Sequence, residues 1–305
     1  RYQNYSSDDR TRLFSYASLN YDIAPWLSAL GRVSIDTYKQ LQEERRAIGS
    51  VPANFGIGTG GGDGSINRNP ASSGYSRKNI GFSEYNYDFM LNYNTDITQK
   101  LNLKGVVGVN IRRSYYNSIF AATNGGLSIA KLYSLQNTAS PLLAPIERDE
   151  TIGVDGIYGS ASFGYDDYLF LEGTIRRDHS STLPKENSSY YYPSVSTSFV
   201  FSKFIQADWF SFGKLRLNYA EVGNSPGFDR ILDTYAVNTA FGAASASVKD
   251  TKNNPNLKPE RTKSYEAGIE LSFFKKRLGL DLSYYKSNSI DQIIPLRLTS
   301  STGYL

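Results

Sequence analysis

Apolar side chains recur at every second position through most of this sequence, and this period of two restricts its fold more than any other feature. One example is the odd-numbered set Leu101, Leu103, Gly105, Val107, Val109 and Ile111. The residues between them are mostly polar. A period of two places alternate side chains on opposite faces of a β-strand, whereas a helix needs a period near 3.6. The pattern predicts an all-β chain whose strands have one apolar and one polar face.

The same alternation predicts ten antiparallel strands, at 11–22, 27–40, 81–94, 100–113, 154–166, 168–177, 190–202, 213–223, 262–274 and 278–290. Each is long enough to cross a membrane, which takes about 9–11 residues. The first strand is ambiguous, because Phe14 and Tyr16 lie on its otherwise polar face. No run of about 18 apolar residues occurs, so no conventional transmembrane helix is expected.

The links between the predicted strands alternate strictly in length. Short links are expected at 23–26, 95–99, 166–167, 203–212 and 275–277, and long links at 41–80, 114–153, 178–189 and 224–261. Transmembrane β-barrels have short periplasmic turns on one rim and long extracellular loops on the other. A soluble β-sandwich has no reason to sort its links in this way. The alternation therefore favours a transmembrane antiparallel β-barrel.

Tyrosine is unusually frequent, with 24 Tyr beside 16 Phe and 2 Trp. Many lie near the ends of predicted strands, such as Tyr85, Tyr87, Tyr93, Tyr115, Tyr116, Tyr165, Tyr168, Tyr190, Tyr191, Tyr192, Tyr284 and Tyr285. Rings with a polar tip suit the headgroup level of a membrane. Cross-strand aromatic pairing in an ordinary sheet is the alternative explanation. The sorted links favour aromatic girdles.

Composition excludes most catalytic and metal chemistry. The chain has no Cys, one His and a net charge of +4, which argues against disulfides, thiol nucleophiles, most metal sites and nucleic-acid binding. Gly56–Gly61 matches G-x-G-x-x-G but has no helix after it, so a nucleotide site is not expected. A Ca²⁺ site near Asp63 would lack the spaced ligands of known loops. We expect no enzymatic activity and no cofactor.

Four segments carry a resemblance to a known family. The first is Asn254–Gly268, which reads N-P-x-L-K-P-E-x-T-x-S-x-E-x-G. The second is Gly159–Ser181, a predicted hairpin with an R-x-D-x-S-S end at Arg176–Ser181, and the others are Tyr192–Ser196 and Lys214–Asn224. Together they resemble the SusC/RagA-like TonB-dependent outer-membrane transporters. The resemblance is strong over the last half of the chain and rests on pattern in the first half.

The resemblance implies a 22-stranded, plugged barrel in the outer membrane of a Gram-negative bacterium. Residues 1–305 would be a middle-to-late barrel segment, with the plug domain, the TonB box and the C-terminal strand outside it. The family implies import of large nutrients, most often oligosaccharides and otherwise oligopeptides. It also implies a SusD-like surface lipoprotein and TonB as partners, and leaves a dimer of the transporter–lipoprotein pair open.

Parity suggests which side chains face the lumen: Arg32, Asp36, Asp88, Lys104, Arg112, Glu172, Arg176, Lys214, Arg216, Glu266, Glu270 and Asp281. Both charge signs occur, which suits hydrogen bonding to a neutral polar solute or ion pairs with the plug better than a single-sign ion filter. Candidate substrate-binding residues are Tyr115, Tyr116, Tyr190 and Tyr191 beside the long links, together with Arg112 and Arg176. The tyrosines could instead belong to the outer girdle.

Two other protein classes remain as alternatives. A self-contained porin or adhesin barrel would need a signal peptide and an aromatic C-terminal strand, and neither is visible in the sequence. A secreted carbohydrate-binding β-sandwich or enzyme would have unsorted links and no lipid-facing stripe.

Overall fold

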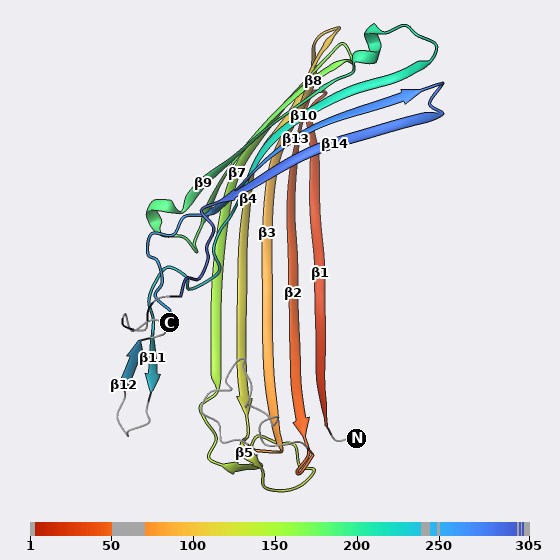
Figure 1. Ribbon diagram of the computed structural model, residues 1–305. Helices are drawn as coiled ribbons and strands as arrows, with labels where there is room; N and C mark the ends of the chain where they lie inside the picture. The colour runs from red at the N-terminus through yellow and green to blue at the C-terminus, as the bar shows by residue number, and fades with distance from the viewer. Residues whose placement is uncertain are drawn as a thin grey trace. The chain divides into compact units, whose positions relative to one another are not determined.

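The computed structural model describes residues 4–50, 71–238, 245–248, 251–297, 299 and 301. Ten strands form one sheet in the order β1-β2-β3-β4-β7-β8-β9-β10-β13-β14, which can be followed from red to blue in Figure 1. The sequence predicts each of these ten strands, and the prediction of an all-β antiparallel chain is confirmed. No helix among the described residues is long and apolar enough to cross a membrane.

The strands of this sheet differ in length. Their bounds are β1 (Tyr5–Ala24), β2 (Leu27–Arg46), β3 (Gly74–Thr98), β4 (Leu101–Ala122), β7 (Ile146–Tyr165), β8 (Leu169–Ser180), β9 (Ser189–Phe199), β10 (Phe210–Asn224), β13 (Glu260–Phe273) and β14 (Leu278–Ile290). Two small sheets pair β5 (Asn124–Leu127) with β6 (Thr138–Ser140), and β11 (Tyr235–Asn238) with β12 (Ser245–Val248). Short 3₁₀ turns lie at η2 (Lys185–Asn187) and η3 (Phe201–Phe204).

The links follow the predicted alternation except at one place, where link 181–188, predicted to be long, has 8 residues and link 200–209, predicted to be short, has 10. Short links are 25–26, 99–100, 166–168, 200–209 and 274–277, and long links are 47–73, 123–145, 181–188 and 225–259. Strands β2, β3 and β4 extend beyond their predicted ends on the long-link side, to Arg46, Gly74 and Ala122. The extension of β2 escapes prediction because residues 42–46 are polar on both faces, so the sequence has no apolar marker there.

The chain divides into two compact units. The first contains residues 1–17, 33–86 and 113–151, and the second contains residues 18–32, 87–112 and 152–305. In the second unit, register places like side chains in rows. One row runs Phe163↔Leu171, Leu171↔Thr197, Thr197↔Leu217, Leu217↔Ala267 and Ala267↔Tyr284. Directly paired residues of antiparallel strands share a face, so this row defines an apolar face.

The apolar face is open to its surroundings. Leu171 and Leu217 are each 46% exposed and Leu282 is 56% exposed. The alternate residues, such as Glu172 and Arg216, lie on the opposite, polar face. A broad exposed apolar surface is rare in soluble monomers and marks contact with another apolar medium. The sheet thus separates an apolar environment from a polar one.

An aromatic group, termed the rim cluster, covers the short-link end of the second unit. It consists of Tyr165, Tyr168, Phe199, Phe201, Phe204, Trp209, Phe210 and Phe273. The rings of Tyr168 and Phe204 meet edge-on with centroids 4.9 Å apart. Trp209 and Phe273 stack at 6.0 Å. Gly213 provides the space for part of this cluster, because a Cβ there would lie 2.5 Å from the rings of both Phe201 and Phe210.

Replacing Gly213 with valine is expected to lower the free energy of unfolding of the parent protein by about 1–3 kcal/mol, because the new side chain overpacks the rim cluster. The matched control is Gly173→Val, since a Cβ at Gly173 meets nothing within 4 Å. Equilibrium denaturant unfolding in detergent, followed by tryptophan fluorescence, measures both changes. Equal losses in the two variants would contradict a spacing role for Gly213.

Candidate functional site

Charged and amide side chains of the second unit join across the polar face in a chain termed the polar ladder. Arg32 of β2 donates to Asp88 of β3 through Nη2 at 2.9 Å. Asn110 of β4 donates to the other oxygen of the same carboxylate at 2.7 Å. Arg176 of β8 donates to Asn110 Oδ1 at 3.4 Å, and its Nε lies 2.7 Å from Asp178 Oδ1. The ladder thus connects strands from β2 to β8.

Glycines on the intervening strands make the ladder sterically feasible. A Cβ at Gly156 of β7 would lie 2.3 Å from Arg176 Nη2 and 2.5 Å from Asp178 Oδ1. A Cβ at Gly108 of β4 would lie 2.6 Å from the Tyr158 ring, and the Arg176 guanidinium lies 5.5 Å from the centroid of that ring. A glycine inside a strand often marks such a close approach. Arg176 therefore reaches across β7 because β7 has a glycine there.

Burial differs sharply between the ion pairs of the polar face. The Asp178 side chain is 11% exposed, whereas Asp281, the partner of Arg216 at 2.7 Å, is 55% exposed. A buried carboxylate that loses its cation costs more than an exposed one, because water cannot replace the lost partner. Asp88, the partner of Arg32, is 12% exposed. Loss of the Arg176–Asp178 or the Arg32–Asp88 pair is therefore more costly to stability than loss of the Arg216–Asp281 pair.

Two of the predicted site residues, Arg176 and Tyr190, lie on the polar face together. Arg176 belongs to the polar ladder, and Tyr190 pairs in register with Asp178. The Tyr190 ring meets Tyr192 edge-on at 4.9 Å, and its side chain hydrogen-bonds with Ser225 at the start of a long link. Arg112 lies in β4 two residues beyond Asn110, and its parity places it on the same face.

Three predicted tyrosines have other surroundings. Tyr191 pairs with Arg177 on the apolar face, and the Arg177 guanidinium lies 5.9 Å from its ring centroid. Tyr115 and Tyr116 belong to the first unit and, as strand neighbours, point to opposite faces. Tyr115 meets Tyr85 edge-on at 6.2 Å, and Arg148 lies 5.7 Å from the Tyr116 ring. The six predicted residues therefore do not form one cluster.

The Asn254–Glu260 motif forms a hydrogen-bonded junction between long links. Asn187 donates to the carbonyl oxygens of Asn256 at 3.3 Å and Leu257 at 3.1 Å. Glu260 accepts from the Ile293 N–H at 2.9 Å and from Asn224 at 3.4 Å. The motif thus holds link 181–188, the ends of β10 and β13, and the segment after β14 in one arrangement.

A second set of hydrogen bonds joins the two ends of link 225–259. Asp233 accepts from Lys252 Nζ and, at 2.8 Å, from the Asn253 N–H. The Asn253 side chain donates to the carbonyls of Leu232 at 2.6 Å and Asp229 at 3.1 Å. The hydrogen bond from Lys252 lowers the pKa of the Asp233 carboxyl below its ordinary value, and the Asn253 N–H lowers it further. The loop contact is therefore strongest with Asp233 ionised.

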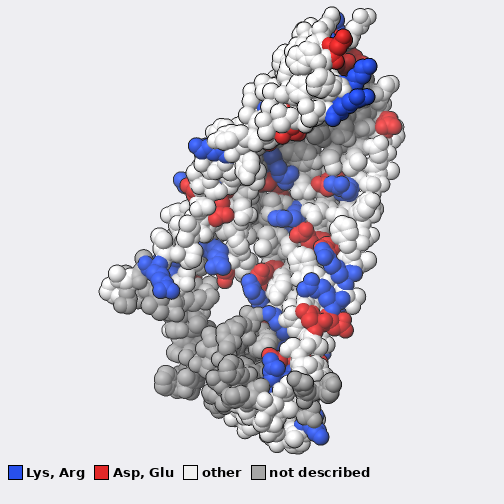
Figure 2. Space-filling model, turned by 45° about the vertical axis from the view of Figure 1, so that its right-hand side comes forward, with Lys and Arg blue, Asp and Glu red and all other residues white. Residues whose placement is uncertain are grey.

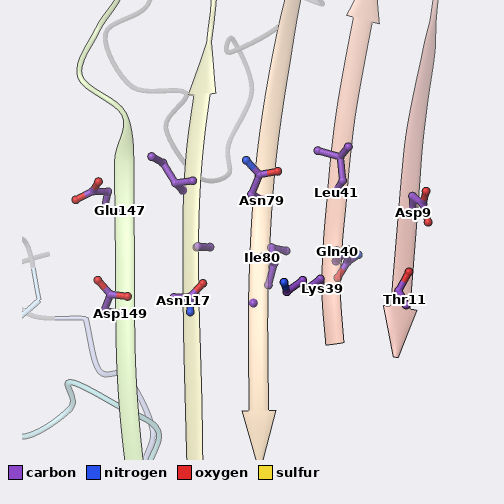
Figure 3. Close-up of a pocket in the computed structure, with 13 residues that line it drawn as sticks. Asp9, Thr11, Lys39, Gln40, Leu41, Asn79, Ile80, Asn117, Glu147 and Asp149 are labelled. Atoms are coloured by element: carbon purple, nitrogen blue, oxygen red, sulfur yellow. The ribbon is translucent and has the colours of Figure 1, made fainter. Parts of the chain in front are cut away.

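The first unit carries a polar groove of about 670 Å³ across β1, β2, β3, β4 and β7. Figure 3 shows side chains from all five strands around it, including Asp9, Lys39, Asn117 and Glu147. Among the described residues, no group of three or more His, Asp or Glu side chains is placed to hold a metal ion. The Gly56–Gly61 motif and Asp63 lie outside the described residues. The groove thus presents hydrogen-bonding side chains from all five strands.

Sequence reasoning finds only part of the polar ladder. The lumen-facing set predicted from parity contains Arg32, Asp88 and Arg176, but it does not contain Asn110 or Asp178. Gly108 and Gly156, each a glycine interrupting a strand pattern, are the signal that could have located the crossing side chains. Charges of both signs intermingle on the molecular face shown in Figure 2. The polar face thus offers many hydrogen-bonding groups and no field of a single sign.

Comparison with known proteins gives a consistent result. The family model described as TonB dependent receptor-like, β-barrel, matches residues 1–304. TonB-dependent receptor P26 of Formosa agariphila is 22% identical over 245 residues, which are 75% of this chain and 24% of the relative. TonB-dependent receptor P39 of the same organism is 24% identical over 246 residues, 76% of this chain and 23% of the relative. The chain thus spans about a quarter of these relatives.

Solved structures share the fold. The RagAB peptide transporter structure matches with a TM-score of 0.83 and 18% identity, covering 99% of this chain and 32% of that chain. The Ferric-Catecholate import receptor Fiu from K12 E. coli matches with a TM-score of 0.56 and 15% identity, covering 94% of this chain and 42% of that chain. At these identities, the likeness concerns the fold alone.

Replacing Arg176 with alanine is expected to destabilise the parent protein by about 1–3 kcal/mol, because Asp178 is left buried without its cation. The matched control, Arg216→Ala, should cost less than about 1 kcal/mol, since Asp281 remains accessible to water. The double variant Arg176→Ala/Asp178→Ala should lose less stability than the sum of its single changes. Denaturant unfolding measures these three variants and the single variant Asp178→Ala. Equal losses from Arg176→Ala and Arg216→Ala would contradict the argument.

Acidification is expected to loosen link 225–259. The folded pKa of Asp233 is depressed, so its contribution is complete above the unfolded pKa of about 3.9 and is lost as pH falls through the lower folded value. Hydrogen exchange of the Asn253 amide, corrected for intrinsic rates, should show protection falling over that range. In Asp233→Asn the protection should not depend on pH in this way. Unchanged protection of the wild type at low pH would overturn this expectation.

Proposed function

Because the chain belongs to the TonB-dependent receptor β-barrel family, we propose that it forms part of the wall of an importer for oligosaccharides too large for a porin. Proteins of this family lie in the outer membrane of Gram-negative bacteria and act as transporters and receptors. The apolar face of the sheet therefore contacts lipid, and the polar face lines the lumen. The polar ladder is then a lumen feature.

The pairing of lumen charges carries this proposal. Arg32 contacts Asp88, Arg176 contacts Asp178, and Arg216 contacts Asp281. An anionic cargo would be drawn by cations that lack internal partners, whereas these guanidinium groups are already matched by carboxylates. What the face still offers is a dense set of hydrogen-bond donors and acceptors. That supports a cargo that is neutral, polar and extended.

Aromatic rings beside the long links support a sugar cargo further. Tyr190 and Tyr192 lie edge to face on the polar side, next to the link that Ser225 begins. The apolar body and polar tip of a tyrosine suit a ligand that is apolar on one side and hydroxylated on the other. We propose that Tyr190 and Tyr192, with Tyr116 in the first unit, contact cargo.

The junction of long links is proposed as the seat of a SusD-like surface lipoprotein. Asn187 ties link 181–188 to the Asn254–Glu260 motif, so two loops present one ordered surface. The RagAB structures are described as a peptide transporter and as a peptide importer in 'open-open' and 'closed-closed' states. Peptide import by the same architecture is the alternative for this chain. The plug, the TonB contact and the remaining strands would come from sequence outside residues 1–305.

Uptake by the source bacterium tests the proposed function. Deleting the gene of the full-length parent, or altering the segment that contacts TonB, should abolish growth on oligosaccharides and leave growth on the corresponding monosaccharide unchanged. The variant Tyr190→Ala should slow oligosaccharide uptake several-fold, because it removes one contact between an aromatic ring and the sugar, worth about 1 kcal/mol. The control is Tyr87→Ala. Tyr87 is the neighbour of Asp88 in β3, so its side chain lies on the opposite face from the polar ladder and should not contact cargo.

Two outcomes would contradict the proposal. Loss of growth on peptides with undiminished growth on oligosaccharides would replace the sugar cargo with the peptide alternative. Normal uptake of both classes in the deletion strain would reject the importer.

A further inference from the structure

The apolar face of the second unit contains a groove of about 430 Å³ over β9, β10, β13 and β14. Ala267 lies between the larger Leu217 and Tyr284 in one row of paired residues, and this small side chain leaves the face hollow. The groove is lined chiefly by Val195, Thr197, Leu217, Tyr219, Tyr265, Ala267 and Tyr284. It therefore offers a mostly apolar bed in the surface that contacts lipid.

Charged residues lie directly beyond the groove on the long-link side. Glu221 pairs in register with Lys263 on the same face as Tyr219. Its carboxylate contacts Arg261 and lies 3.8 Å from Lys263 Nζ, and Tyr219 donates a hydrogen bond to it. The Glu221 side chain is only 8% exposed. A nearly buried carboxylate thus holds two basic side chains at the end of the groove.

The positive charge at this end exceeds the negative charge. Glu221 supplies one carboxylate for Arg261 and Lys263, and Lys286 is the register partner of Tyr265 on the adjacent strand. Lys286 is exposed, and the structure shows no ion pair for it within the part of the chain described. Three cations therefore accompany one carboxylate, and a bound anion would balance the difference.

We propose that this groove binds a phosphorylated lipid of the outer leaflet, with an acyl chain against Leu217 and Ala267 and a phosphate at Lys263 and Lys286. The apolar bed and the cations are adjacent in the order that such a lipid requires. Link 225–259 joins β10 to β13 just beyond Lys263, and long links mark the extracellular rim of such barrels. Basic side chains at a membrane surface bind anionic headgroups. The site lies on the opposite face from the lumen and is independent of the cargo.

Native mass spectrometry of the detergent-purified full-length parent, titrated with lipid A, tests the proposal. Lys263→Gln/Lys286→Gln should weaken lipid A binding about tenfold or more, because two cations near the phosphate are removed. Ala267→Phe should weaken it by filling the groove while every charge stays in place. Dephosphorylated lipid A should bind the wild type as weakly as lipid A binds the double-lysine variant.

The matched control is Lys275→Gln/Lys276→Gln. It removes the same charge from the short link between β13 and β14, the strands that carry Lys263 and Lys286. Its affinity for lipid A should equal that of the wild type. The proposal is overturned by equal affinities of the wild type and both site variants, or by equal binding of phosphorylated and dephosphorylated lipid. Full displacement of lipid A by millimolar inorganic phosphate would also overturn it, because the groove would then contribute nothing. Heat-dependent migration in gels confirms that each variant is folded.

Discussion

The hydrogen-bond ladder between neighbouring strands is the constraint on which everything else in this protein depends. Inside a membrane, each backbone N–H and C=O must find a partner in the protein, because no water is available and an unpaired group costs several kcal/mol. Pairing sequence neighbours as hairpins meets that demand with the shortest links. Once the ladder is fixed, alternate side chains are committed to two different media, and the sequence must alternate accordingly. Shifting one strand by a single residue would place its leucines in the lumen and its charges in lipid.

Glycine determines where side chains can cross the polar face. Strands in a sheet lie about 4.8 Å apart, so a long side chain that reaches the second strand must pass over the one between. Gly156 leaves the space through which Arg176 reaches Asn110, and Gly108 leaves space for the ring of Tyr158. The polar ladder therefore depends on the missing side chains at Gly108 and Gly156 as much as on the charged groups that meet there.

Much of this architecture follows from the sequence, because parity and link length are local properties. Parity alone assigns Arg32, Asp88 and Arg176 to one face. Link length orders the rims except where link 181–188 is shorter than link 200–209. Parity does not state which residues of neighbouring strands lie opposite each other, so it does not predict that Asn110 joins Asp88 to Arg176. It also fails where both faces are polar, as at the extended end of β2, because the pattern there loses its contrast. Parity also predicts that Tyr190 and Tyr191 lie on opposite faces. Both are predicted as candidates because both lie near a long link, and that criterion does not distinguish the two faces.

The boundary between the two media is most sharply drawn on the apolar face of β10 and β13. Along β10 the outward residues pass from Leu217 to Tyr219 and then to Glu221, and along β13 they pass from Ala267 to Tyr265 and then to Lys263. Each strand thus goes from aliphatic to aromatic to charged within five residues. Glu221 is the unusual member, since a carboxylate at the edge of a lipid layer faces a large desolvation cost. Arg261, Lys263 and the Tyr219 hydroxyl surround it, so its charge is neutralised within the protein. The same cations thereby stay fixed at the headgroup level, with more positive charge than Glu221 alone can balance.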